Sequence, residues 1–216
     1  MAGTDPTLST LRVDPVVPEM AVVRKAAAVL AAGGLVAFPT DTFYGLAIDP
    51  RMAGPVEQLL RVKSRSTAAA IPLIAADLSQ VESDLGVLTL SSGRLARRFW
   101  PGPLTLVVDT SADLDPRLLA GGKTIAVRVP DHAVARALAA ALGHPITSTS
   151  ANWARVSPST TAAGVVTALG SEVTLVLDAG PSPGGAPSTI VDARGRNPLL
   201  LRAGVVPWDC VVQSLV

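Results

Sequence analysis

Hydroxyl and basic side chains gather at the ends of the strands that the sequence predicts. Open α/β sheets place their ligands at strand ends, and hydroxyls combined with Lys or Arg suit the oxygens of phosphates and carboxylates. The sequence therefore predicts a binding site for an anionic ligand, although each Ser or Thr taken singly is more readily a turn or cap residue. The side chains concerned are Thr40, Thr42, Lys63, Arg65, Thr124, Arg128, Ser148, Thr149, Ser150, Asn152, Ser188, Thr189 and Arg202.

Nucleophiles and metal ligands are scarce in this chain. It has one cysteine, Cys210, and two histidines, His132 and His144. A Cys-based metal cluster and an intrachain disulfide are therefore excluded, little room remains for His-based chemistry, and a reduced, cytoplasmic setting is the simplest interpretation. No Walker-type phosphate loop and no G-x-G-x-x-G motif is present. The net charge of +1 and the aromatic content of 3% give no support to a nucleic-acid binder.

The elements that must position these side chains alternate between helix and strand. With 216 residues, 49% of them hydrophobic, the chain can form one large α/β domain or two small ones. Several strands follow one another late in the chain, which predicts a mixed, twisted sheet with flanking helices rather than a regular Rossmann repeat. Helices are predicted over residues 18–32, 55–63, 94–99, 131–142 and 161–169, and strands over 35–38, 71–75, 104–108, 124–129, 145–149, 173–177, 188–191 and 199–202.

Local signals mark several boundaries. The pair Gly33-Gly34 should end the first helix, Asp131 should cap the fourth helix and Gly143 should end it. The Gly-, Pro- and Ser-rich stretch Gly180–Pro187 is suited to a mobile lid. The N-terminus has no secretory pattern, and the early apolar stretch is interrupted by basic residues and glycines, so neither a signal peptide nor a membrane span is expected.

Seven motifs in a fixed order carry a family resemblance that covers about residues 20 to 206. The chain resembles the YrdC family, and the combination of motifs is highly specific although no single one is. The motifs are Gly33–Leu46, Lys63-Ser64-Arg65, Phe99–Thr105, Ala126–Pro130, Ser150-Ala151-Asn152, Ser188–Val191 and Leu201–Gly204.

The resemblance implies a YrdC-like α/β fold with a large basic cavity on one side of a twisted sheet. It implies a single domain over residues 1–216, without the extra C-terminal domain of the longer family branch. The implied activity is that of a nucleotidyltransferase, which makes threonylcarbamoyl-AMP and pyrophosphate from L-threonine, bicarbonate and ATP, usually with Mg²⁺ carried by the nucleotide. A separate transferase would then pass the threonylcarbamoyl group to an adenosine of tRNA.

The matching positions imply roles for single residues. L-threonine would be contacted by Thr42, Arg128, Ser148 and Ser188, and no metal-ligating residue is expected. Lys63 and Arg65 would assist catalysis electrostatically, because a threonine carbamate that attacks the α-phosphate needs no protein nucleophile. ATP would be contacted by Arg65, Thr124, Ser150, Asn152, Ser157 and Arg202.

Departures from the family pattern keep other interpretations open. Ser66, Ala69, Ala70 and the segment Trp153–Arg155 replace residues that are commoner in the family, and they put the nucleotide contacts in question. One alternative is a homologue that forms a carbamoyl adenylate. Another is a non-catalytic module that binds double-stranded RNA, although charge and aromatic content argue that direct RNA binding is weak. A third is a paralogue that has lost activity.

Overall fold

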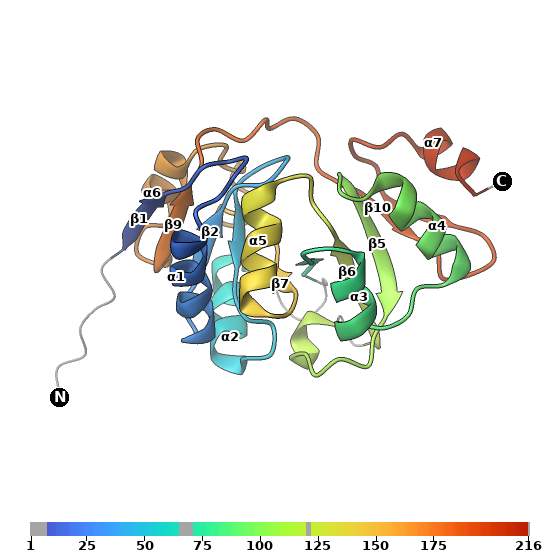
Figure 1. Cartoon of the computed structure of the whole chain (residues 1–216), viewed down its shortest axis with the longest axis horizontal. Coiled ribbons are helices and arrows are strands. Elements are labelled where there is room, and N and C mark those ends of the chain that lie inside the picture. The colour runs from blue at the N-terminus through green and yellow to red at the C-terminus, as the bar shows by residue number, and fades with distance from the viewer. Residues whose placement is uncertain (1–7, 65–70, 120–121, 216) are drawn as a thin grey trace.

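The computed structural model describes residues 8–64, 71–119 and 122–215 (Figure 1). Strands and helices interleave along the chain, and the strands form two mixed sheets. The first sheet has the order β1-β9-β2-β3-β8, in which β1, β9 and β2 are parallel and the last two pairings are antiparallel. Its strands are β1 (Ser9–Arg12), β2 (Val36–Phe38), β3 (Gly45–Ala47), β8 (Thr149–Ser150) and β9 (Leu175–Asp178).

The second sheet has the order β11-β10-β5-β6-β4-β7. The pairs β10–β5 and β4–β6 are parallel, and the other three pairs are antiparallel. A single residue, Ser148, separates β7 of this sheet from β8 of the first, so the chain crosses between the sheets at that point. The strands are β4 (Leu73–Ile74), β5 (Leu104–Asp109), β6 (Thr124–Arg128), β7 (Ile146–Thr147), β10 (Thr189–Asp192) and β11 (Leu199–Arg202).

The helices cover the outer faces of the sheets. In Figure 1, α1 and α5 lie side by side. The helix α1 contacts β2 and β9 of the first sheet, whereas α5 contacts β4 and α4 contacts β5 of the second. Within the described part of the chain, no helix is long and apolar enough to cross a membrane. The helices are α1 (Met20–Ala31), α2 (Ala53–Val62), α3 (Leu78–Asp84), α4 (Leu90–Phe99), α5 (Ala133–Leu142), α6 (Ala162–Leu169) and α7 (Trp208–Gln213), with a 3₁₀ turn at Pro116–Leu118.

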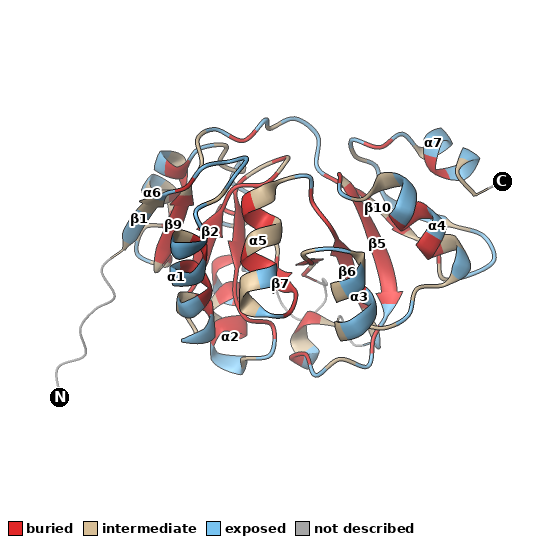
Figure 2. Cartoon of the chain, in the orientation of Figure 1, coloured by how far each residue is buried: buried red, intermediate tan, exposed pale blue. Residues whose placement is uncertain are grey.

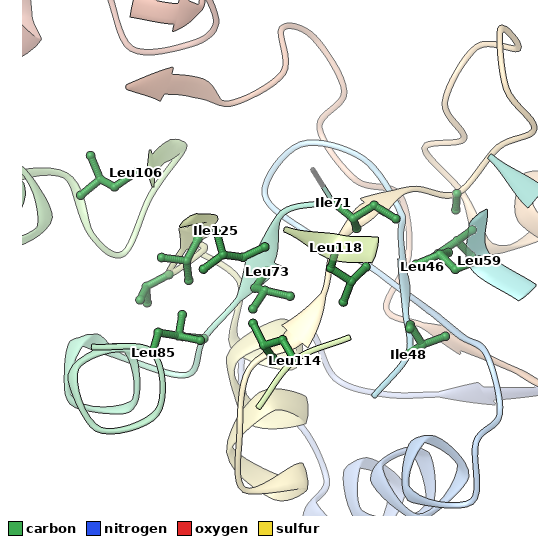
Figure 3. Close-up of a cluster of buried hydrophobic side chains, with 14 of the residues drawn as sticks. Leu46, Ile48, Leu59, Ile71, Leu73, Leu85, Leu106, Leu114, Leu118 and Ile125 are labelled. Atoms are coloured by element: carbon green, nitrogen blue, oxygen red, sulfur yellow. The ribbon is translucent and has the colours of Figure 1, made fainter. Parts of the chain in front are cut away.

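A hydrophobic cluster joins the two sheets. It contains Leu46 of β3 together with Leu73 and Leu106 of the second sheet, all fully buried (Figure 3). In Figure 2 the strands are mostly buried, whereas the outward faces of α1 and α4 are exposed. Because both sheets contribute to one core, a shift of either sheet would expose apolar surface that the other now covers.

A second cluster packs α1 against α5 with small side chains. Ala26 and Ala27 of α1 and Ala135 and Ala139 of α5 are buried there. Alanine lets helix backbones approach closely, and this accounts for a core built with few aromatic residues. Gly33, with φ of +85°, terminates α1 in the left-handed region that favours glycine.

The predicted mixed α/β fold is confirmed, with differences in detail. The strands form two sheets where the sequence indicated one, and the strand predicted over residues 145–149 is divided by Ser148 between them. The predicted cap at Asp131 is wrong: α5 has His132 at its N-cap position, and no side chain caps it. Instead, Asp131 lies 3.5 Å from the guanidinium of Arg136. The elements β1, β3, α3 and α7 were not predicted, since each is too short to show a clear period.

A buried contact between His144 and Asp49 connects the segment after β3 to the turn that follows α5. His144 Nε2 lies 3.0 Å from Asp49 Oδ1, and the Arg51 amide also donates to that oxygen. Burial acts to raise the pKa of Asp49, but these two hydrogen bonds outweigh it and hold the pKa below its usual range. Asp49 therefore stabilises the folded state in its ionised form.

We expect Asp49→Asn to lower the free energy of unfolding at pH 7 by about 1–3 kcal/mol. The pKa of Asp49 in the folded protein lies below its unfolded value of about 3.9. The difference in unfolding free energy between Asp49→Asn and the wild type should therefore persist from pH 7 down to about pH 3.9 and vanish as the pH falls through the folded pKa. Urea unfolding between pH 7 and pH 3 measures it, with Asp113→Asn at an exposed position as control. A difference that does not change with pH would contradict this assignment.

Candidate ligand-binding site

A cavity of about 390 Å³ is lined by residues from both sheets. Its wall is formed by the turn after β2, the crossing at Ser148, the end of β6, and the starts of β5 and β10. Seven Ser or Thr side chains line the cavity, and six of them are among the strand-end hydroxyls that the sequence singled out. The lining residues are Thr40, Thr42, Phe43, Tyr44, Gly45, Pro72, Leu73, Thr105, Arg128, Ser148, Thr149, Ser150, Pro158, Gly185, Pro187, Ser188 and Arg202.

The charges on the wall favour an anionic ligand. Arg128 and Arg202 are the charged members of the lining set, which contains no Asp or Glu among the described residues. Arg128 is buried, and its Nη1 lies 3.0 Å from Asp41 Oδ1. These two atoms face each other without hydrogen-bond alignment, so the contact is an ion pair only. Burial lowers the pKa of Arg128 and Asp41 opposes this effect, yet a guanidinium stays protonated in proteins.

The turn after β2 presents Thr42 to the cavity. The Thr40 hydroxyl accepts a hydrogen bond from the Thr42 amide at 3.1 Å and donates to the Phe43 carbonyl at 2.7 Å. Arg128 Nη2 also reaches Thr40 Oγ1, at 3.5 Å. A short, internally bonded turn of this kind fixes the direction of its side chains before any ligand binds.

Lys63 lies behind the wall and holds the segment that carries Ser150 and Asn152. Its side chain is buried, and Nζ donates to the Ser150 carbonyl at 2.9 Å and to the Asn152 carbonyl and Oδ1, each at 2.8 Å. Ser150 lines the cavity, whereas Lys63 and Asn152 are not among the lining residues. This geometry favours a positioning role for Lys63.

The Gly180–Pro187 loop is tied to the cavity wall. The Tyr44 hydroxyl donates to the Gly180 carbonyl at 2.7 Å, and the Gly184 amide donates to the Thr42 carbonyl at 2.7 Å. Burial, together with the charge of Asp178, raises the pKa of Tyr44 to about 12, so its hydroxyl remains a donor at neutral pH. Gly185 and Pro187 complete the lining, which places the predicted lid beside the site.

The structure brings together most of the residues named from the sequence. All four residues expected to contact threonine line the cavity, as do two of those expected to contact ATP; they are Thr42, Arg128, Ser148, Ser188, Ser150 and Arg202.

The remaining candidates lie elsewhere. Thr124 is at the opposite end of β6 from Arg128, about 13 Å away for a five-residue strand, and Ser157 is an exposed neighbour of the lining residue Pro158. Arg65, with the departures Ser66, Ala69 and Ala70, lies outside the described residues.

The remaining departure from the family pattern, Trp153–Arg155, does not line the cavity. Trp153 Nε1 instead donates to the Ala168 carbonyl at 2.7 Å and so attaches this segment to α6. Sequence reasoning left out Thr105, which lines the cavity from β5. Its place two residues after the Pro101-Gly102-Pro103 turn was the available signal. The sequence does not show, however, which side chain a hydroxyl in this apolar strand will face.

The fold and the cavity define a mixed α/β domain with a candidate site between two sheets, in which the charged lining side chains among the described residues are two arginines. The chain belongs to the Sua5/YciO/YrdC family, since the family profile, described as "Telomere recombination", matches residues 28–204.

Among its relatives, the threonylcarbamoyl-AMP synthase of Nitrosococcus oceani is 38% identical over 172 residues, which are 80% of this chain and 93% of that protein. The threonylcarbamoyl-AMP synthase of Bacillus subtilis is 37% identical over 183 residues, 84% of this chain but only 53% of the relative. The crystal structure of P. abyssi Sua5 complexed with L-threonine superposes with a TM-score of 0.87 at 31% identity, covering 96% of this chain and 60% of the other.

We expect Lys63→Met to lower the free energy of unfolding by about 1–3 kcal/mol, because it removes the ammonium donor from the buried carbonyl and Oδ1 of Asn152. Lys25→Met, at an exposed position of α1, serves as the matched control and should change little. Thermal unfolding of both variants measures the effect. Unchanged stability of Lys63→Met, combined with lost turnover, would point to a direct electrostatic role for Lys63 instead.

Proposed function

We propose that this protein is a threonylcarbamoyl-AMP synthase that forms threonylcarbamoyl-AMP and pyrophosphate from L-threonine, bicarbonate and ATP. The observation that carries the proposal is the convergence of Thr42, Arg128, Ser148 and Ser188 on one cavity. A relative with that name matches this chain over 93% of its own length. The similar structure of P. abyssi Sua5 is a complex with L-threonine. The cavity supplies hydroxyls and guanidiniums, which suit a carboxylate and a phosphate.

The reaction needs positioned charge rather than a protein nucleophile. The amino group of threonine combines with bicarbonate to give a carbamate, with loss of water. A carbamate oxygen then forms a bond to the α-phosphorus of ATP while the bond from that phosphorus to the pyrophosphate oxygen breaks. The protein would hold the two anions in line and stabilise the charge that develops on the leaving group.

The residues divide into an amino-acid side and a nucleotide side. Thr42, Arg128, Ser148 and Ser188 would bind threonine. Lys63 would position the Ser150–Asn152 segment, as its hydrogen bonds indicate. The nucleotide side would consist of Arg65, Thr124, Ser150, Asn152, Ser157 and Arg202.

Mg²⁺ would enter with the nucleotide. No cluster of three or more His, Cys, Asp or Glu side chains suited to a metal ion occurs among the described residues, so the phosphates would supply much of its coordination. When bound, Mg²⁺ would neutralise phosphate charge. The enzyme would act in the cytoplasm as a nucleotidyltransferase, and a separate transferase would move its product to tRNA adenosine.

Release of pyrophosphate should require threonine, bicarbonate and ATP together. We expect Arg128→Met to lower this activity by roughly 100-fold or more, since a buried charge that orients an anion is lost. The exposed Arg24→Met variant, purified in the same way, should retain wild-type activity. A loss confined to Arg128→Met would exclude a contaminating ATPase as the source of the pyrophosphate. Equal release without threonine, or with carbamoyl phosphate in its place, would favour the carbamoyl-adenylate alternative, and no release would favour an inactive paralogue.

Duplex RNA should bind weakly, with a dissociation constant above about 1 µM at physiological salt. The net charge of +1 provides little counterion release, and aromatic side chains for base stacking are scarce. Fluorescence anisotropy with labelled duplex RNA over a salt series measures this. A tighter, sequence-independent complex at that salt would favour the RNA-binding alternative.

A further inference from the structure

Two buried hydroxyls, those of Thr105 and Ser188, face each other in the cavity wall. Thr105 in β5 is 1% exposed, and Ser188, directly before β10, is 7% exposed. Their Oγ atoms lie 2.8 Å apart, and both residues line the cavity. The family resemblance implies a role in threonine binding for Ser188 and none for Thr105.

The backbone of Ser188 is held on several sides. The following amide, of Thr189, donates to the Pro103 carbonyl at 3.0 Å, and Arg202 donates to the Ser188 carbonyl through Nη2 at 2.8 Å and through Nε at 3.1 Å. Gly204 packs so closely that a Cβ atom there would lie 2.5 Å from the Ser188 carbonyl carbon. Since the backbone is held, the partners of the Ser188 hydroxyl decide where its hydrogen points.

The donors around Ser188 Oγ determine that direction. Arg202 Nη2 lies 2.9 Å from Ser188 Oγ, and a guanidinium only donates, so this oxygen accepts. If Thr105 donates as well, both lone pairs of the oxygen are used and its hydrogen is left for the cavity. In the reverse order the Thr105 hydrogen would have to reach a ligand instead, and Thr105 is the more deeply buried of the two, at 1% exposed against 7% for Ser188. A hydroxyl that accepts two hydrogen bonds is also a stronger donor.

We propose that Thr105 is a positioning residue that donates to Ser188 Oγ, so that the Ser188 hydroxyl hydrogen points into the cavity as a donor to the substrate carboxylate. A carboxylate fits because the wall carries the guanidiniums of Arg128 and Arg202 and no acidic group among its described residues. This inference rests on the proposed function, since it names the contact by which the same site would recognise the amino acid.

Calorimetric titration of L-threonine and of L-threoninamide tests this role. Thr105→Val, which keeps the shape and removes the hydroxyl, should weaken threonine binding by about 10-fold. It should weaken threoninamide binding less, because a neutral acceptor gains less from the Ser188 donor than a carboxylate does. The conservative variant Thr105→Ser keeps the hydroxyl and should bind threonine with wild-type affinity. The KM for threonine should rise in Thr105→Val while the KM for ATP stays unchanged.

A double-mutant cycle with Ser188→Ala separates this role from simple packing. In the Ser188→Ala background, Thr105→Val should have no further effect on threonine affinity, since the hydrogen that Thr105 directs is gone. Should Thr105→Val not fold, Thr105→Ala takes its place in the cycle. Additive effects, or equal losses for threonine and threoninamide, would overturn the inference. A wild-type chain that binds no threonine would overturn the proposed function, whereas threonine binding unaffected by Thr105→Val would overturn only the role of Thr105.

Discussion

The ion pair between Arg128 and Asp41 links the two sheets at the cavity. Arg128 ends β6 of the second sheet, and Asp41 lies in the turn between β2 and β3 of the first. A buried guanidinium without a counter-charge is costly, so the two strand ends must meet wherever Arg128 is buried. The same contact leaves Arg128 on the cavity wall, where its charge can act on a ligand. The position of the turn after β2 relative to β6 and the electrostatics of the site therefore both depend on this pair of residues.

Other polar contacts extend this arrangement around the cavity. Lys63, at the end of α2, holds the segment after the crossing at Ser148, and Arg202 of β11 holds Ser188 beside β10. Each of these side chains donates to backbone carbonyls of the segment that it holds. The hydroxyls of the wall are thus fixed before a ligand enters, which suits a reaction that depends on holding two anions in line.

Longer elements followed the local pattern of the sequence more closely than short ones. The helix that ends at Gly33 and the strand around Leu106 were predicted within a few residues, because their apolar spacing or their end signals are local. The short strand β3 and the division at Ser148 were not predicted. Two or three residues show no period of their own, and they are strands only because a neighbouring strand offers hydrogen bonds.

The sequence by itself determined the mixed α/β class and the kinds of side chain at the site, since strand-end hydroxyls and arginines are visible in order along the chain. Only the tertiary structure decided which of them share a wall. It placed Thr42, Arg128, Ser148 and Ser188 together, put Lys63 behind the wall and Thr124 at the far end of β6, and paired Thr105 with Ser188. The physical reason is that strand pairing brings together residues that are far apart in sequence, and sequence spacing carries no record of which strands become neighbours.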